Sequence, residues 1–187
     1  VEVDGECSNV RIWGNTFHDL LTGISLAPVH PGPVYAIRNL IYRVGAGDNI
    51  YRGAPFRFHF SSSWMSGTIF LFHNTCDAVL DGDGFEAGDP GTWKLIYSRN
   101  NIWSATRYAI KNSNHTQAVD LDYDNLYTTL PGELAWLDGL PDGQLTTLAE
   151  LQAATGQELH GSNLVSGFQD AVGGDYTLSS SSPLIDT

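Results

Sequence analysis

Cysteine and basic residues are scarce in this sequence, and long apolar runs are absent. The chain of 187 residues has 2 cysteines, too few for a disulfide scaffold, and Cys76 is expected to be a buried free thiol. Lys and Arg together number 9 against 21 Asp and Glu, which gives a formal net charge of −12. That balance argues against nucleic acid or an anionic membrane as a partner. No apolar stretch approaches the roughly 18 residues that a membrane-spanning helix needs.

Motifs typical of several enzyme classes are also missing. The sequence has no phosphate-binding P-loop, no dinucleotide fingerprint, no Cys/His zinc cluster and no serine nucleophile elbow. Nucleotide-dependent, zinc-dependent and serine-hydrolase chemistry therefore have no support in the sequence.

What the chain does contain is an internal repeat. An asparagine followed by a small or aliphatic residue, and then mostly by a large apolar one, recurs at positions 15, 39, 74, 101, 125 and 163. A spacing of 24 residues appears twice, from Asn15 to Asn39 and from Asn101 to Asn125. A base period near 24 with longer insertions indicates a solenoid whose insertions form loops. We expect each asparagine to adopt the left-handed conformation at a corner and its amide to hydrogen-bond along the stack.

Short alternating strands flank these asparagines. A third strand per coil is predicted at residues 23–28, 55–60, 77–82 and 108–112. Three strands per coil with an asparagine corner resemble the right-handed parallel β-helix of the pectate-lyase-like superfamily. A β-sandwich with regularly spaced strands is the alternative, but it gives no reason for the recurring asparagine.

The last third of the sequence has a different pattern. Residues 146–159 show helical spacing of apolar residues, with Thr146 or Thr147 as N-cap and Gly156 as the stop. The following elements, Phe168 with Asp170, the stretch 174–178 and the stretch 182–186, resemble the tail of bacterial secreted β-helix proteins. We therefore predict an all-β fold with β-helix coils over residues 1–130. A helix-containing insertion and C-terminal closing segment of the same domain follow over residues 131–187.

The N-terminal end of this solenoid lacks an obvious cap. The sequence enters a coil at once, and an open end would expose the core and unpaired strand edges. We expect upstream coils or another chain to cover this end, so that the sequence corresponds to the C-terminal portion of such a protein.

Candidate site residues lie on the third strands and their loops. If Phe58, Leu80 and Ile110 point inward, then His59, Asp81 and Lys111 form one outward column. The neighbouring column then contains Arg57, Val79 and Ala109, with Ser25 or Ala27 extending the row.

Aromatic and acidic side chains surround these columns. Trp64 and Trp93 are either sugar-stacking platforms or loop packing, and His115 is expected to border the groove. The acidic residues at 120, 122 and 124 are interpreted as solubilising charges on the outside of a strand.

The resemblance implies two possible chemistries for a groove of this kind. In the lyases, Ca²⁺ or Arg neutralises a uronate carboxylate and a Lys or Arg removes the adjacent proton. In the hydrolases, two carboxylates act as acid and base. The first chemistry makes Arg57 the carboxylate clamp, Lys111 or His59 the base, and Asp81 with Asp83 possible calcium ligands. A ladder of exposed ion pairs, each contributing about 0–1 kcal/mol, explains the same residues without catalysis.

The sequence thus predicts a carbohydrate-active protein, secreted or on the cell surface of a bacterium. We expect a polysaccharide lyase, or a fragment of one, that acts on an acidic polysaccharide, with a glycoside hydrolase as the second enzyme class. The alternative is a non-catalytic module that binds glycan or extends a larger secreted protein.

Overall fold

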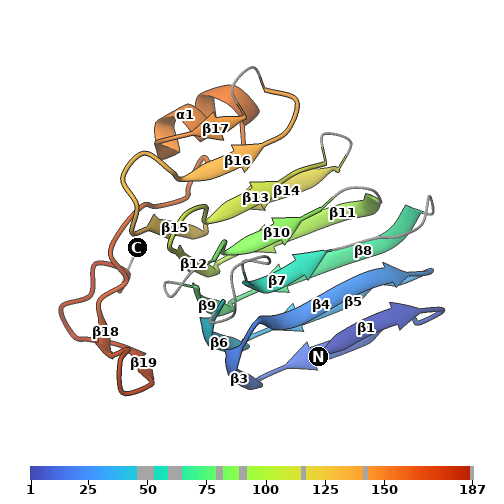
Figure 1. Ribbon diagram of the computed structural model, residues 1–187, viewed down its shortest axis with the longest axis horizontal. Helices are drawn as coiled ribbons and strands as arrows, with labels where there is room; N and C mark the ends of the chain where they lie inside the picture. The colour runs from blue at the N-terminus through green and yellow to red at the C-terminus, as the bar shows by residue number, and fades with distance from the viewer. Residues whose placement is uncertain are drawn as a thin grey trace.

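The protein is a parallel β-solenoid, seen in a computed structural model that describes residues 1–45, 53–58, 65–78, 82–88, 92–114, 117–140 and 143–185 (Figure 1). Three sheets run along its length, and successive strands of the chain visit sheets A, B and C in turn. The predicted β-helix is confirmed. The solenoid has about four turns, and sheets B and C each contain five strands.

Strands of equivalent position in successive coils pair in parallel within each sheet. In spatial order, sheet A contains β1 (Glu2–Gly5), β4 (Thr22–Val29), β7 (Ala54–Phe58), β10 (Phe85–Ala87), β13 (Ile110–Asn112), β16 (Ala135–Leu137) and β17 (Gln144–Leu145). Sheet B contains β2 (Val10–Trp13), β5 (Val34–Ile37), β8 (Met65–Phe72), β11 (Thr92–Arg99) and β14 (Val119–Asp122). Sheet C contains β3 (Thr16–Leu20), β6 (Leu40–Val44), β9 (Thr75–Ala78), β12 (Ile102–Ala105) and β15 (Asn125–Thr128).

The core is built from columns of apolar side chains that repeat at the same position in each coil. In sheet A the column Ile24, Phe56, Phe85, Ile110 and Ala135 is fully buried. Because side chains alternate between the two faces of a strand, the residues next to each column member along its own strand point outward. Cys76 is buried in the equivalent column of sheet C between Ile41 and Trp103, which confirms the expected buried thiol.

A ladder of side-chain amides connects successive coils, as expected. Asn15, Asn39 and Asn74 each donate from the backbone amide and from Nδ2 to Oδ1 of the asparagine one coil further on, at 2.8–3.1 Å. The expected backbone conformation was wrong, however. The left-handed conformation is adopted instead by the residue immediately before each residue of the ladder. These residues are Gly14, Arg38, His73, Asn100 and Tyr123. The asparagine is therefore selected for its hydrogen bonds and not for its tolerance of a positive φ.

The predicted helix closes the far end of the solenoid. Helix α1 (Leu148–Thr155) begins at Thr147, whose side chain and Glu150 form a capping box, and ends at Gly156 in the left-handed conformation. Leu151 is buried, and Leu145 and Leu148 pack against the core beside it. The helix and β17 thus cover the last coil.

The residues after the helix run back along the side of the solenoid. Figure 1 shows the antiparallel pair β18 (Phe168–Asp170) and β19 (Asp175–Leu178) beside the sheet C strands β3, β6 and β9. The centroid of the Tyr176 ring lies 4.6 Å from the centroid of the Tyr42 ring on β6. This segment therefore packs against early coils and does not lie over the end of the solenoid.

Candidate functional site

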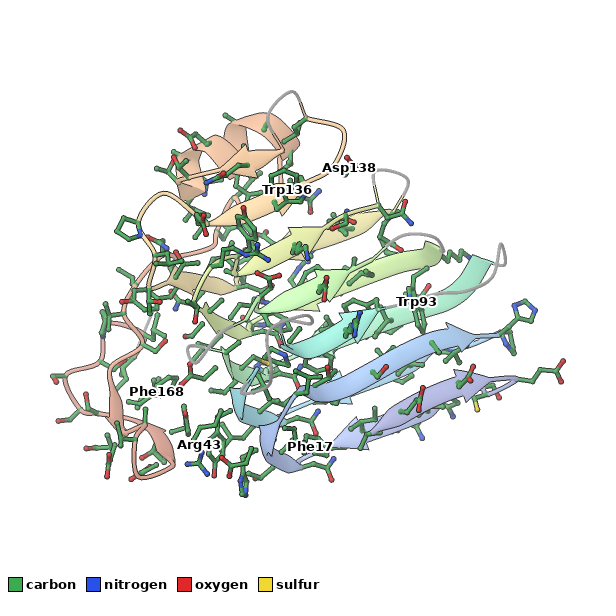
Figure 2. The ribbon with its side chains drawn as sticks, in the orientation of Figure 1. Phe17, Arg43, Trp93, Trp136, Asp138 and Phe168 are labelled. Carbon is green, nitrogen blue, oxygen red and sulfur yellow. The ribbon has the colours of Figure 1, made fainter. Side chains whose placement is uncertain are left out.

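One row of outward side chains crosses sheet A and includes two of the predicted site residues. Ser25, Arg57, Glu86, Lys111 and Trp136 occupy equivalent positions on five neighbouring strands. Adjacent strands are about 4.8 Å apart, so Arg57 and Lys111 lie on either side of Glu86, about 9.6 Å from each other along the row. Figure 2 labels Trp136 at one end of this row.

Glu86 forms ion pairs with both of its cationic neighbours. Lys111 Nζ donates to Glu86 Oε1 at 2.7 Å, and Arg57 Nε lies 3.7 Å from Glu86 Oε2. The side chains of Arg57, Lys111 and Glu86 are 28%, 23% and 18% exposed. Both cations therefore keep part of their surface open to solvent, where a ligand can reach them.

Asp83 lies beneath the same row and holds a third cation. Arg107 donates from Nε to Oδ1 at 3.1 Å and from Nη2 to Oδ2 at 2.9 Å, a two-pronged contact. Lys111 Nζ lies 3.5 Å from Oδ2, and the Asp83 side chain is only 1% exposed. Asp83 therefore anchors Arg107, and both of its oxygens are already occupied by donors.

The row and its anchor concentrate basic side chains, and the Glu133 charge also acts on Arg107. Arg57, Arg107 and Lys111 lie together with Asp83 and Glu86 on one face of a chain that carries −12 overall. We call these five residues the sheet A charge cluster. It holds three of the 9 basic residues of the chain.

The predicted register of this face was wrong. Residues 75–78 form β9 of sheet C, and the sheet A strand of that coil is the three-residue β10. Arg57 lies in the same row as Lys111, whereas the sequence predicted it in the neighbouring column. Ala109, expected to point outward, is fully buried. Sequence reasoning missed Glu86, because it lay in a segment interpreted as a loop.

Trp93 is a core residue and not a sugar-stacking platform. Its side chain is 1% exposed, and its ring packs edge-on against Phe58 at 6.4 Å between centroids. The backbone amide of Trp93 donates to Gln117 Oε1 at 2.7 Å. The other expected site residues His59, Trp64, Asp81 and His115 lie outside the described residues. Among the residues that the structure describes, no group of three potential metal ligands occurs.

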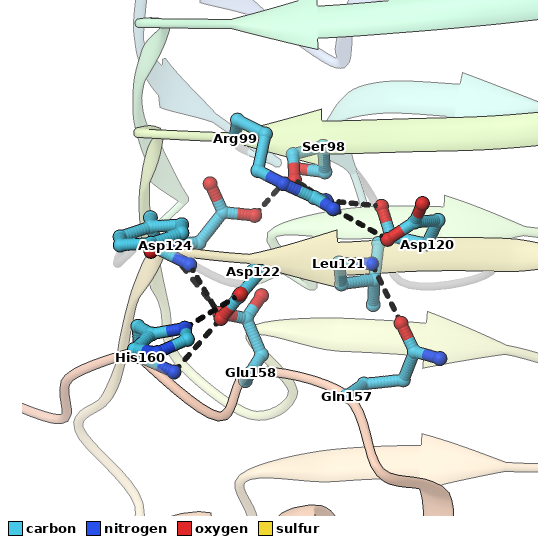
Figure 3. Close-up of polar contacts among 10 residues, drawn as sticks. Ser98, Arg99, Asp120, Leu121, Asp122, Asp124, Gln157, Glu158 and His160 are labelled. Carbon is cyan, nitrogen blue, oxygen red and sulfur yellow. Dashed lines mark hydrogen bonds and ion pairs between the residues drawn. The ribbon is translucent and has the colours of Figure 1, made fainter.

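A second polar cluster, missed in the sequence, terminates the asparagine ladder (Figure 3). Asp124 occupies the ladder position that was expected for Asn125. Its Oδ1 accepts from the backbone amide of Asn101 at 2.7 Å and from Nδ2 of the same asparagine at 3.0 Å. Ser98 Oγ donates to the other oxygen at 2.5 Å. Glu158 takes the next rung, where Asn163 was expected, and accepts from the Asp124 amide at 3.1 Å.

Burial dominates the electrostatics of this acidic pair. Burial, together with the neighbouring Asp124 charge, raises the pKa of Glu158 to about 9, and burial also raises the pKa of Asp124. Glu158 therefore carries its proton at neutral pH. Both side chains are almost completely buried, so the pair is structural and faces no groove.

The surface acids near this pair are held by a histidine and an arginine. His160 Nδ1 lies 2.8 Å from Asp122 Oδ2, and Arg99 Nη2 donates to Asp120 Oδ1 at 2.5 Å. Burial alone would raise the pKa of Asp122, but the hydrogen bonds from His160 lower it. The interpretation of residues 120, 122 and 124 as a set of solubilising charges was therefore wrong for Asp124, which is buried.

Comparisons with known proteins give no relative for this chain. No family model, no curated protein and no solved structure matches it. In the described part of the chain, no helix is both long and apolar enough to cross a membrane. The site must therefore be interpreted from its own chemistry.

Proposed function

We propose that the outer face of sheet A binds an acidic polysaccharide. The observation that supports this is the sheet A charge cluster, which gathers three of the 9 basic residues on one face of a chain whose net charge is −12. The resemblance of the coils and tail to secreted bacterial pectate-lyase-like proteins agrees with the same substrate class and with an extracellular location. A field of opposite sign around these basic residues restricts an anionic ligand to this one face.

Arg57 and Lys111 are the proposed contacts to uronate carboxylates. A guanidinium matches a carboxylate with two parallel hydrogen bonds, while an ammonium supplies a point charge. Their positions on either side of Glu86 would let an extended chain cross the strands along the row. Glu86 competes with the ligand for both cations, so binding is expected to be moderate and sensitive to salt.

Lyase chemistry is a second candidate, supported by Arg57 and Lys111 sharing one row. In that reaction Arg57 would hold the uronate carboxylate while Lys111 accepts the proton from the adjacent carbon. The glycosidic C–O bond then breaks, the proton ends on the leaving oxygen or in water, and a carbon–carbon double bond remains. Lys111 would first have to leave Glu86 and release its own proton to water, because only the neutral amine can act as the base. His59 is the alternative base, outside the described residues.

Calcium has no place in this proposal. Both oxygens of Asp83 accept from Arg107, and Lys111 Nζ lies 3.5 Å from one of them, so a cation at Asp83 would meet two positive charges. The described residues therefore do not fit the ion, and its other expected ligand, Asp81, lies outside them.

Binding and turnover can be measured separately. Titration of a uronate oligosaccharide, with a neutral oligosaccharide of equal length for comparison, should give binding of the uronate alone. The double variant Arg57→Gln/Lys111→Gln should weaken it at least tenfold, whereas Arg11→Gln on sheet B should not. Ultraviolet absorbance of unsaturated uronate products then reports turnover. Binding without turnover favours the non-catalytic module, and equal binding by both variants contradicts the proposal.

We also propose that a further coil or another chain covers strands β1, β2 and β3, which are the end strands of the three sheets. Asn15 supports this, because among the described residues nothing donates to its Oδ1, although the same atom of Asn39 accepts two hydrogen bonds. A coil with an asparagine at its corner would supply both donors.

A further inference from the structure

A cavity of about 320 Å³ lies between the outer face of sheet C and the C-terminal segment, on a different face from the sheet A charge cluster. Asp77, Ser104 and Tyr127 line it from equivalent positions on β9, β12 and β15. Val165, Ser166 and Phe168 line it from the C-terminal segment. Figure 2 labels Phe168 on that segment, where it runs along the side of the solenoid.

The C-terminal segment is fixed at one side of this cavity. Tyr176 Oη donates to Asp77 Oδ2 at 2.8 Å, across 99 positions of the sequence, and the Phe168 ring packs edge-on against Tyr176 at 4.9 Å. These contacts fix the segment against β9 at one side of the cavity.

Three polar side chains converge on the cavity from its buried side. Asp77, Ser104 and Ser166 are 4%, 3% and 4% exposed. Ser166 Oγ is buried and has no hydrogen-bond partner among the described residues. Because the Ser166 Oγ atom itself is closed off from solvent, the polar groups that a ligand in the cavity would meet are those of Asp77 and Ser104.

The remaining walls are apolar. The Tyr127 and Phe168 rings and the Val165 side chain form most of the lining. A largely apolar cavity of a few hundred cubic ångströms with a few converging polar groups is the usual form of a small-molecule site. Aromatic faces pack against the C–H faces of sugar rings, and the hydroxyls around the ring supply donors and acceptors for polar groups at the rim.

We propose that this cavity binds a neutral saccharide unit. Sugar hydroxyls bond to Ser104 Oγ and the Asp77 carboxylate, while the ring lies against Tyr127 and Phe168. Asp77 and the acidic chain repel a uronate, so the ligand here is of a different charge class from the ligand of sheet A. The inference does not rest on the function proposed for that sheet.

Ligand-observed NMR on the whole chain tests the site with defined probes. Glucose, galactose, mannose and N-acetylglucosamine represent the neutral class, galacturonate the anionic class and n-butylammonium the cationic class. At least one neutral sugar should bind, with galacturonate and n-butylammonium showing no competing effect. Failure of every neutral sugar, or displacement of a bound sugar by either charged probe, overturns the proposal.

Two variants locate the binding. Ser104→Ala removes the hydroxyl that faces the ligand and should weaken sugar binding by about fivefold. Tyr127→Ala removes a wall on the accessible side and should weaken it similarly, without disturbing the buried hydroxyls. Arg57→Gln/Lys111→Gln, on sheet A, should leave the affinity unchanged. Circular dichroism and thermal midpoints verify folding of each variant. Unchanged affinity in both pocket variants, or loss in the sheet A variant, overturns the assignment.

Discussion

The backbone amide of Asp124 donates to Glu158 Oε2 at 3.1 Å, and the two carboxyl groups are buried together at the end of the asparagine ladder. Asp124 begins the corner of the last complete coil, and Glu158 follows helix α1. The contact therefore joins the solenoid to the segment that closes it. It also places a second carboxyl group where only one charge can be accommodated.

Alkaline pH should weaken the fold through Glu158. Its pKa is about 9 in the folded protein and near 4.5 when unfolded, so the folded state binds the extra proton between these values. The stability that this proton gives the folded state is fully present below pH 4.5 and is lost as pH rises through 9. Glu158→Gln keeps a neutral group that can accept from Asp124. It should raise the free energy of unfolding by about 2 kcal/mol at pH 8 and flatten its pH dependence, measured by urea denaturation.

Glu150→Gln provides the matched control for that experiment. Hydrogen bonds from Thr146 and Thr147 lower the pKa of Glu150, so its contribution is present above the unfolded pKa and lost in acid. This variant should lose stability at neutral pH and little at pH 3. Equal pH profiles for the two variants would contradict the role assigned to Glu158.

Removal of one internal amide should destabilise the solenoid more than removal of the terminal one. Asn74→Ala leaves the buried amide of Asn39 without an acceptor and removes two donors, so it should cost about 3 kcal/mol. Asn15→Ala, at the exposed end, should cost about 1 kcal/mol. Urea denaturation of both variants measures the difference. Similar losses would show that the ladder contributes little beyond local conformation.

Glu86→Gln should strengthen binding of a uronate oligosaccharide. The change removes the carboxylate that pairs with Lys111 and lies near Arg57, so both cations become available and the cluster gains one positive charge. The expected gain is about 1 kcal/mol, or roughly fivefold in affinity, with a steeper dependence on salt. Calorimetric titration at two salt concentrations measures it. Weaker binding would mean that Glu86 itself contacts the ligand.

Calcium should leave the thermal stability of the wild-type protein unchanged, because Arg107 already neutralises Asp83. Asp83→Asn, in contrast, should cost about 3 kcal/mol, since Arg107 then loses its buried partner. Thermal unfolding with calcium chloride and with a chelator tests the first expectation, and urea denaturation tests the second. A calcium-dependent rise in the midpoint would restore the hypothesis of an ion at Asp81 and Asp83.

The repeat could be predicted from sequence because the same polar residue, an asparagine with a buried side chain, recurs from coil to coil. A side-chain amide is worth burying only where neighbours satisfy it, so the recurrence of asparagine at 39, 74 and 101 indicated stacking. The last two rungs could not be found in this way. Asp124 and Glu158 accept hydrogen bonds as an asparagine does, and nothing local separates Asp124 from the adjacent Asn125.

The site was predicted less well because a three-residue strand has almost no local signal. Residues 75–80 alternate as a strand should, whereas Phe85–Ala87 lies among glycines and acidic residues and resembles a loop. β10 forms because β7 and β13 on either side supply its hydrogen bonds. Arg57 and Lys111 were therefore identified as outward residues, but Glu86 between them was not.

The asparagine ladder has a direction, and the direction limits how such a molecule can grow. From Asn15 to Asn74, one Nδ2 proton goes to the following asparagine and the other to a backbone carbonyl, and no proton comes back. An inserted coil with the same corner residue therefore fits anywhere from Asn15 to Asn101. The Asp124 side chain has no N–H group with which to continue the series. Duplication of internal coils would therefore lengthen the protein without new chemistry, whereas extension beyond Asp124 would first require an amide in its place.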